Sequence, residues 1–401
     1  YACDAHCMNC GELTNENATH TVAYQAAVEA TCEATGNVAY WYCSDCGTCW
    51  LDEAQTQVTN RMSVVTVGDH KYEDGKCVYC GEADPNAPVY KVILKSYDVS
   101  LEGEVKMLFK VEIPAGLVGS GAYARMTVAD RSEDFPVDEI YASDLDGSDY
   151  VELGVPAMYM TKDVTIQFFN ADGSVMPVYS SKGVEFASYT KSVADVIRVN
   201  LGKNPDAATK NVLIGLATYG GYAQTFFKSS FPLVDAEPVY NLLAEYGLSK
   251  ADVSGITQST VDGYLFNKGE SNGLTLKSAD AELQAAINMI MLFEMDAQYS
   301  VGDFSAVAIS PTGARTDVKI EYNNHYGRYA IVVDDIPAMY WDNDYRVEIT
   351  NNVTGVTNTV SGSVMAVVRL VMRNEGNPQA VKELVAAMYV YGKAATEKFG
   401  R

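Results

Sequence analysis

The chain has 401 residues, with 29 Lys and Arg against 52 Asp and Glu and a formal net charge of −23. At about 150 residues per domain, this length predicts two or three domains. The acidic charge repels phosphate backbones, so the composition excludes nucleic acid and anionic membrane surfaces as partners. No stretch approaches the roughly 20 apolar residues that a membrane helix needs, and we expect no insertion into a membrane.

The N-terminal segment, residues 1–87, is set apart by its Cys and His. All nine Cys lie within residues 3–80, together with three of the four His. The pattern C-x-x-C-G occurs three times, beginning at Cys7, Cys43 and Cys77. This spacing turns two thiolates toward one ion, and the Gly permits the tight turn that follows. An odd number of Cys would leave one thiol unpaired if disulfides alone stapled the segment. The pattern therefore predicts a zinc-ribbon-like module, and disulfides remain the alternative in an oxidising exterior.

Each C-x-x-C-G motif has its own candidate ligands for Zn²⁺. The middle motif offers a complete tetrahedral set, namely His20, Cys32, Cys43 and Cys46. The third offers His70, Cys77 and Cys80, and the first offers Cys3, Cys7 and Cys10 with His6 among them. The missing fourth ligands could come from another motif or from Cys49. Thiolate-rich sites are usually closed and structural, and a small segment needs a staple, so we expect structural rather than catalytic zinc.

Residues 88–231 change to alternating, β-branched and aromatic runs. We predict strands at residues 89–94, 105–111, 123–128, 164–169 and 175–179. A helix is predicted next, because Val193, Val196, Ile197 and Leu201 share one apolar face. Asn204 and Pro205 are expected to begin a second helix, which ends near Phe227.

The same order of motifs returns later in the chain. Leu-Lys-Ser-Tyr-Asp at 94–98 matches Leu-Lys-Ser-Ala-Asp at 276–280, and Val-Pro-Ala-Met-Tyr at 155–159 matches Ile-Pro-Ala-Met-Tyr at 336–340. Asn204-Pro205 returns as Asn377-Pro378, and the tail Tyr219-Gly-x-x-Ala223 returns at Tyr391. We therefore predict a duplicated domain, with copies at residues 88–231 and 273–401 and a connector at 232–272, helical over 239–248. The predicted fold is mainly β with α: after the Cys-rich module, two tandem antiparallel β-sandwiches, Ig-like, each closed by a helix pair.

These motifs together resemble those of large multi-domain cell-surface proteins of anaerobic Gram-positive bacteria. The resemblance rests on the Cys/His repeats that end in Tyr-Trp-Tyr-Cys-Ser-Asp-Cys-Gly (40–47) and Cys-Val-Tyr-Cys-Gly (77–81), and on the two Tyr-Gly-x-x-Ala-x-x-x-Phe helical ends. It implies an exported location, secreted or at the cell surface, and a modular architecture. We find no signal peptide, sorting motif or terminal anchor, and expect a processed form or an excised piece.

Outside the Cys-rich module, the sequence offers few groups for chemistry. His325 is the only His there, and we expect it to lie in a polar loop between strands. Asp334-Asp335 and the acidic run at 144–149 could suggest calcium, but the run at 144–149 lacks the downstream Glu of a calcium-binding loop and is expected to be an acidic turn. We therefore expect no enzyme but a non-catalytic extracellular structural or adhesive protein, a stalk or fibre-forming subunit with a protein partner or self-association into a fibre. The alternative is a pair of carbohydrate-binding modules, in which exposed Tyr side chains and Trp341 would stack on sugar rings.

Overall fold

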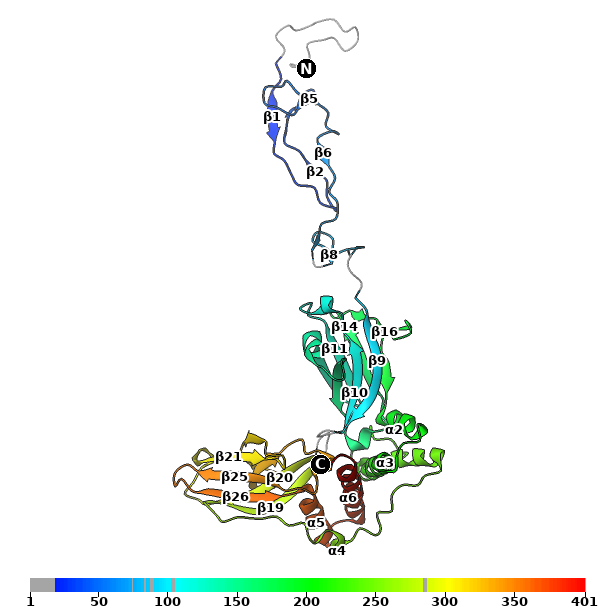
Figure 1. Ribbon diagram of the computed structural model, residues 1–401. Helices are drawn as coiled ribbons and strands as arrows, with labels where there is room; N and C mark the ends of the chain where they lie inside the picture. Colours follow the sequence, from blue (N-terminus) through cyan, green and yellow to red (C-terminus); the bar gives the residue numbers. More distant parts are fainter. Residues whose placement is uncertain are drawn as a thin grey trace. The chain divides into compact units, whose positions relative to one another are not determined.

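The computed structural model describes residues 19–73, 75–82, 84–86, 90–101, 105–283 and 287–400. The chain forms two compact units, Tyr1–Val89 and Tyr90–Arg401 (Figure 1). The described part is mainly β, with helices confined to the second unit. Among the described residues, no helix has the length and apolar character required to cross a membrane.

The first unit consists of short strands with a very small apolar core. One antiparallel sheet has the order β1-β3-β4-β5, with strands Val22–Gln25, Tyr40–Cys43, Cys49–Trp50 and Val58–Thr59. Two strand pairs follow, β2 with β6 (Gly36–Asn37, Val65–Thr66) and β7 with β8 (Tyr72–Glu73, Lys76–Cys77). The buried cluster comprises Cys43 and Trp50 with Val22 packed against them. The apolar burial among the described residues of this unit is too small to offset by itself the entropy of ordering them, so this region needs a staple.

The first half of the second unit contains two antiparallel-rich sheets. One has the order β13-β10-β9-β16-β17, with strands Asp149–Gly154, Lys106–Glu112, Val92–Ser100, Val178–Ser180 and Glu185–Phe186. The other has the order β12-β11-β14-β15, with strands Arg131–Pro136, Tyr123–Val128, Val164–Phe169 and Val175–Met176, and β18 (Tyr189–Lys191) also pairs with β14. Helix α1 (Val137–Ala142) and the 3₁₀ turns η1 (Ala115–Leu117) and η2 (Ala157–Tyr159) connect them.

The second half repeats this plan with fewer strands. One sheet has the order β19-β20-β24-β23, with strands Leu274–Leu283, Ile287–Met295, Arg328–Val333 and Glu321–Asn323. The other has the order β22-β21-β25-β26, with strands Arg315–Val318, Phe304–Ile309, Tyr345–Asn351 and Thr357–Gly362. The 3₁₀ turns are η4 (Val301–Asp303) and η5 (Ala338–Tyr340). Side chains from all four sheets of the second unit join one continuous core.

The two halves share a detail that sequence matching alone does not reveal. The pairing of β9 with β10 shifts register at Lys95, and the pairing of β19 with β20 shifts at the matching Lys277. Each bulged Lys forms an ion pair with a matching acid on the neighbouring strand, Glu112 and Glu294. The two halves have a β-bulge at the matching position with the matching ion pair. This supports the predicted duplication, because bulges are usually retained within a fold.

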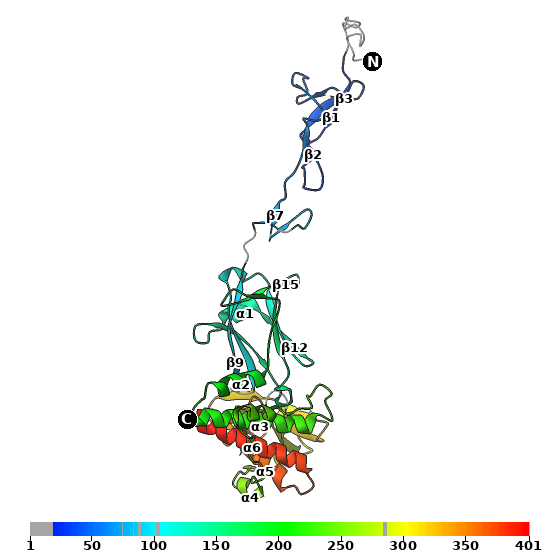
Figure 2. The ribbon, with the colours of Figure 1, turned by 90° about the vertical axis from the view of Figure 1, so that its right-hand side faces the viewer.

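Four helices join the two halves. They are α2 (Val193–Gly202), α3 (Ala207–Phe227), α5 (Val364–Arg373) and α6 (Gln379–Phe399). Helices α3 and α6 pack side by side (Figure 2), and the repeated Tyr219 and Tyr391 stack with ring centroids 5.9 Å apart. Tyr219 and Tyr391 occupy matching positions of the two halves. Contact between matching positions is typical of the two-fold interface of a homodimer, and here it occurs within one chain. The helix pairs therefore join the copies to each other as well as packing on their own halves.

The N-terminus of α3 is fixed to the end of α6. The Asp206 side chain accepts a hydrogen bond from the Thr209 N–H (2.7 Å) and pairs with Lys398 (3.0 Å). The backbone donor and the Lys lower the pKa of Asp206 to about 2. Asp206 thus caps α3, and the prediction that Asn204 does so is wrong. Asn204 has a φ of 50°, the left-handed conformation that ends α2 instead.

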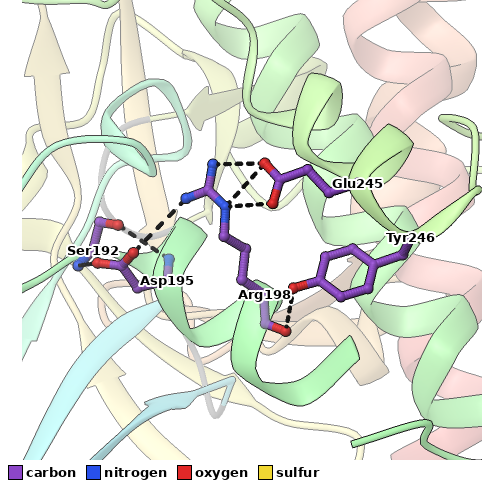
Figure 3. Close-up of polar contacts among 5 residues, drawn as sticks. All are labelled: Ser192, Asp195, Arg198, Glu245 and Tyr246. Carbon is purple, nitrogen blue, oxygen red and sulfur yellow. Dashed lines mark hydrogen bonds and ion pairs between the residues drawn. The ribbon is translucent and has the colours of Figure 1, made fainter. Parts of the chain in front are cut away.

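The connector predicted at residues 232–272 packs against the helices. It forms the 3₁₀ helix η3 (Val239–Tyr246) and the short α4 (Gln258–Val261). Figure 3 shows how α2 holds η3: Arg198 donates to both carboxylate oxygens of Glu245, and the Tyr246 hydroxyl donates to the Arg198 carbonyl. The α2 helix itself begins in a capping box between Ser192 and Asp195. This segment is therefore an integral part of the helical layer.

The prediction of one continuous strand at residues 175–179 is wrong. The structure breaks it at Pro177 into β15 and β16, which belong to different sheets. Pro has no N–H to donate to a ladder, so a single continuous strand cannot pair through this position. The break lets the chain leave one sheet and enter the other.

Candidate metal centre

Four ligand atoms from distant segments meet beside β8. Cys32, His70, Cys77 and Cys80 each offer one atom, and all four atoms lie within 4.8 Å of one another. The Sγ atoms of Cys32 and Cys77 are 3.6 Å apart, and His70 Nδ1 is 3.3 Å from Cys80 Sγ. With Zn–S bonds of about 2.3 Å, the edge of a tetrahedron is about 3.8 Å. The cluster therefore has the donor set and the spacing of a tetrahedral metal site.

A second cluster of three ligands lies at the end of β3. His20, Cys43 and Cys46 also lie within 4.8 Å of one another, and His20 Nδ1 is 3.4 Å from Cys46 Sγ. The ring of Trp50 packs edge-on against His20, with centroids 4.8 Å apart. The small apolar core of this unit thus holds the imidazole in place.

Both clusters are built on the same backbone turn. The carbonyl of Cys43 accepts from the Gly47 N–H and that of Cys77 from the Gly81 N–H, each at 2.8 Å. Gly47 and Gly81 have φ angles of 74° and 75°. This conformation is strained for residues with a side chain, so the structure confirms the predicted role of the Gly in C-x-x-C-G.

The turns also stabilise thiolates. The Cys46 backbone N–H and, further, the His20 side chain lower the pKa of Cys43 to about 6. For Cys77, burial raises the pKa, but the N–H groups of Cys80 and Tyr79 outweigh it and the pKa falls to about 6. Thiolates are the form in which Cys binds metal, so one Cys of each turn is already shifted toward the binding state. Burial and the thiols of Cys80 and Cys77 raise the pKa of Cys32 to about 12 instead.

Glu82 belongs to the candidate site, and the sequence interpretation missed it. Its carboxylate lies 3.2 Å from His70 Nε2, while Nδ1 of the same ring faces Cys80. A carboxylate on the outer nitrogen fixes the ring orientation and raises the basicity of the ligating nitrogen. The signal was available, because Glu82 directly follows the third C-x-x-C-G.

The grouping of ligands differs from the prediction. Cys32 was assigned to His20, Cys43 and Cys46, but it lies with His70, Cys77 and Cys80. Cys49 is outside both clusters, and its thiol donates to the Gly47 carbonyl. All six Cys that the structure describes are free thiols, so no disulfide forms among them. The predicted ligands Cys3, Cys7 and Cys10 lie outside the described residues.

The other candidate residues take different positions. Trp341 is 2% exposed and donates its ring N–H to the Ile336 carbonyl, so it is not the exposed sugar-stacking residue that the alternative interpretation requires. The acidic run at 144–149 is a turn in which Asp144 accepts from the Gly147 N–H and Asp146 pairs with Lys110. His325 lies in the exposed turn between β23 and β24, against the ring of Tyr326.

Comparison with known proteins gives little guidance. No protein-family model and no curated protein matches the chain. Among solved structures, the chain is similar at 9% identity and a TM-score of 0.16 to one described as "Ca2+-stabilized adhesin helps an Antarctic bacterium reach out and bind ice". That match covers 86% of this chain and 73% of the other.

Proposed function

We propose that the two Cys/His clusters bind structural zinc. The observation that carries this proposal is the position of Cys32, which reaches the turn of Cys77 across 45 residues of chain. A metal ion there would tie together segments that have almost no apolar core of their own. Three thiolates and one imidazole match the softness and geometry of Zn²⁺. With all four positions filled by protein, the larger cluster has no open position for a substrate.

We further propose that the protein is a non-catalytic structural or adhesive component of the cell surface or its surroundings, and that the sheets of each half form an Ig-like β-sandwich. The duplicated halves, joined through α3 and α6, support a load-bearing role, because the joint buries aromatic rings from both copies. Self-association into a fibre and binding of a partner protein are both compatible with this role.

Native mass spectrometry with and without chelator tests the zinc proposal. We expect two zinc ions in the described region, a further ion only if the N-terminal motif binds one, and free thiols after chelation. The same spectra report oligomers if the chain polymerises. A metal-free chain lighter by two hydrogens per disulfide would refute the proposal.

A further inference from the structure

The second half of the Tyr90–Arg401 unit contains a broad open groove. Its volume is about 940 Å³, and strands of both sheets line it, β21 and β22 from one and β23 and β24 from the other. Its lining includes the rings of Tyr322, Tyr340 and Tyr345. Five carboxylates line it against a single Lys319, namely Glu282, Asp317, Glu321, Asp334 and Asp335. The groove is therefore both aromatic and strongly negative.

The first half has no such carboxylate pair. Strand pairing places Leu153 opposite Met107 and Val333 opposite the matching Met289. After these matched residues, the first half has the single residue Gly154 before Val155-Pro156. The second half has two residues, Asp334 and Asp335, before the matching Ile336-Pro337. In the first half, the chain between β12 and β13 forms α1, which buries Val137 and Ile140. In the second half, the corresponding segment between β22 and β24 forms the edge strand β23 instead. At these matched positions, the carboxylate pair and the edge strand that line the groove thus belong to the second half alone.

One buried polar side chain of the groove lacks a partner. Tyr345 is 6% exposed, and its hydroxyl forms no hydrogen bond with any described residue. Neither Asp334 nor Asp335 forms an ion pair within the described part of the chain. Burial, then Asp335 and Glu282, raise the pKa of Asp334. A hydroxyl with no partner in the described part of the chain and a carboxylate disfavoured in its charged form both gain from a cationic donor in the groove.

We propose that this groove binds a basic polypeptide segment, with a Lys or Arg side chain lying against Asp334 and Asp335 and the tyrosine rings. Charge complementarity favours a cation, and aromatic faces attract ammonium and guanidinium groups. The groove is much larger than a metal ion requires and accommodates several side chains. This inference rests on the proposed adhesive role and names the class of partner for it.

Binding of fluorescent hexalysine and hexaarginine to the full chain, measured by anisotropy, tests the proposal. We expect saturable binding that weakens as salt rises. The double substitution Asp334→Asn and Asp335→Asn should weaken it at least tenfold, and Asn suits the φ of 52° at position 335. The matched control, Glu375→Gln with Glu397→Gln, removes the same charge from exposed positions elsewhere in the unit and should change the affinity less than twofold.

Equal affinities for these two double variants would overturn the proposal, because binding would then reflect overall charge. Binding of uncharged oligosaccharides in place of hexalysine would also overturn it, in favour of a glycan site. Tyr345→Phe should weaken peptide binding severalfold. Asp334→Asn alone should raise the melting temperature and weaken peptide binding severalfold. If Asp334 served only the structure, its substitution would lower the melting temperature. Chelator should leave peptide binding intact, so failure of the zinc proposal and failure of this one are distinguishable.

Discussion

Replacing Tyr391 by Phe should stabilise the protein. Tyr391 lies on α6 with 1% exposure, stacked on Tyr219 and edge-on to Trp341 at 5.5 Å. Its hydroxyl oxygen is fully buried and has no hydrogen-bond partner. In the unfolded chain this hydroxyl binds water, so folding removes a hydrogen bond without replacing it.

The size of the effect follows from two opposing contributions. An unsatisfied buried polar group costs about 1–3 kcal/mol, which the substitution recovers. The oxygen-sized void, on the order of 15 Å³, costs about 0.4 kcal/mol at about 24 cal/mol per Å³. The ring and its stacking are retained. We therefore expect a net gain of about 0.6–2.6 kcal/mol in the free energy of unfolding.

Guanidinium unfolding followed by circular dichroism measures this gain as a higher midpoint of the transition of the second unit. Tyr219→Phe is the matched control, because its ring occupies the repeated position but its hydroxyl is not among the fully buried, unpaired groups. It should shift the midpoint little. If Tyr391→Phe instead lowers the free energy of unfolding by more than about 0.5 kcal/mol, the hydroxyl has a partner such as an ordered water, and the reasoning is wrong.

Other expectations concern the metal, the pH and the helix packing. Cys32→Ser should remove one zinc ion in native mass spectra and Cys49→Ser none, because Cys49 lies outside both clusters. Asp206, with a pKa of about 2 in the fold, adds stability that is complete above its ordinary pKa of 3.8 and declines as pH falls toward 2. Asp206→Asn should therefore weaken the pH dependence of the denaturation midpoint between about pH 4 and 2. Gly392→Ala should cost about 1–3 kcal/mol, because its Cβ would meet Met and Trp side chains at 2.7 and 2.9 Å, whereas Gly255→Ala, in open space, should be neutral in the same melts.

The parts of the fold that could be predicted are those with a local pattern. Strands Tyr123–Val128 and Val164–Phe169 alternate apolar and polar residues, and the structure has them with the predicted bounds. Strand Arg131–Pro136 was missed because it lies at a sheet edge with mostly exposed side chains, so it carries no alternation. Edge strands are often charged in this way, which resembles a loop in sequence.

The candidate site shows the same division between local and distant information. The turn at Cys77 and the role of Gly81 follow from five consecutive residues, and they were predicted. The cluster to which Cys32 belongs could not be predicted, because both clusters use the same kinds of ligand. Spacing favoured the nearer Cys43, but the chain between Cys32 and His70 returns to the third motif instead. Donor chemistry therefore identifies metal ligands without assigning them to sites.

The predicted duplication offers a way to separate folding constraints from function within one chain. Both copies must satisfy the same packing, so features that they share are explained by the fold: the bulged Lys95 and Lys277, or the Tyr219 and Tyr391 pair. A feature of one copy alone has no such explanation. Asp334 replaces a Gly, leaves a carboxylate with a raised pKa, and is therefore expected to cost stability where it stands. If Asp334→Asn raises the free energy of unfolding, packing alone does not account for the carboxylate, and the proposed peptide binding becomes its explanation.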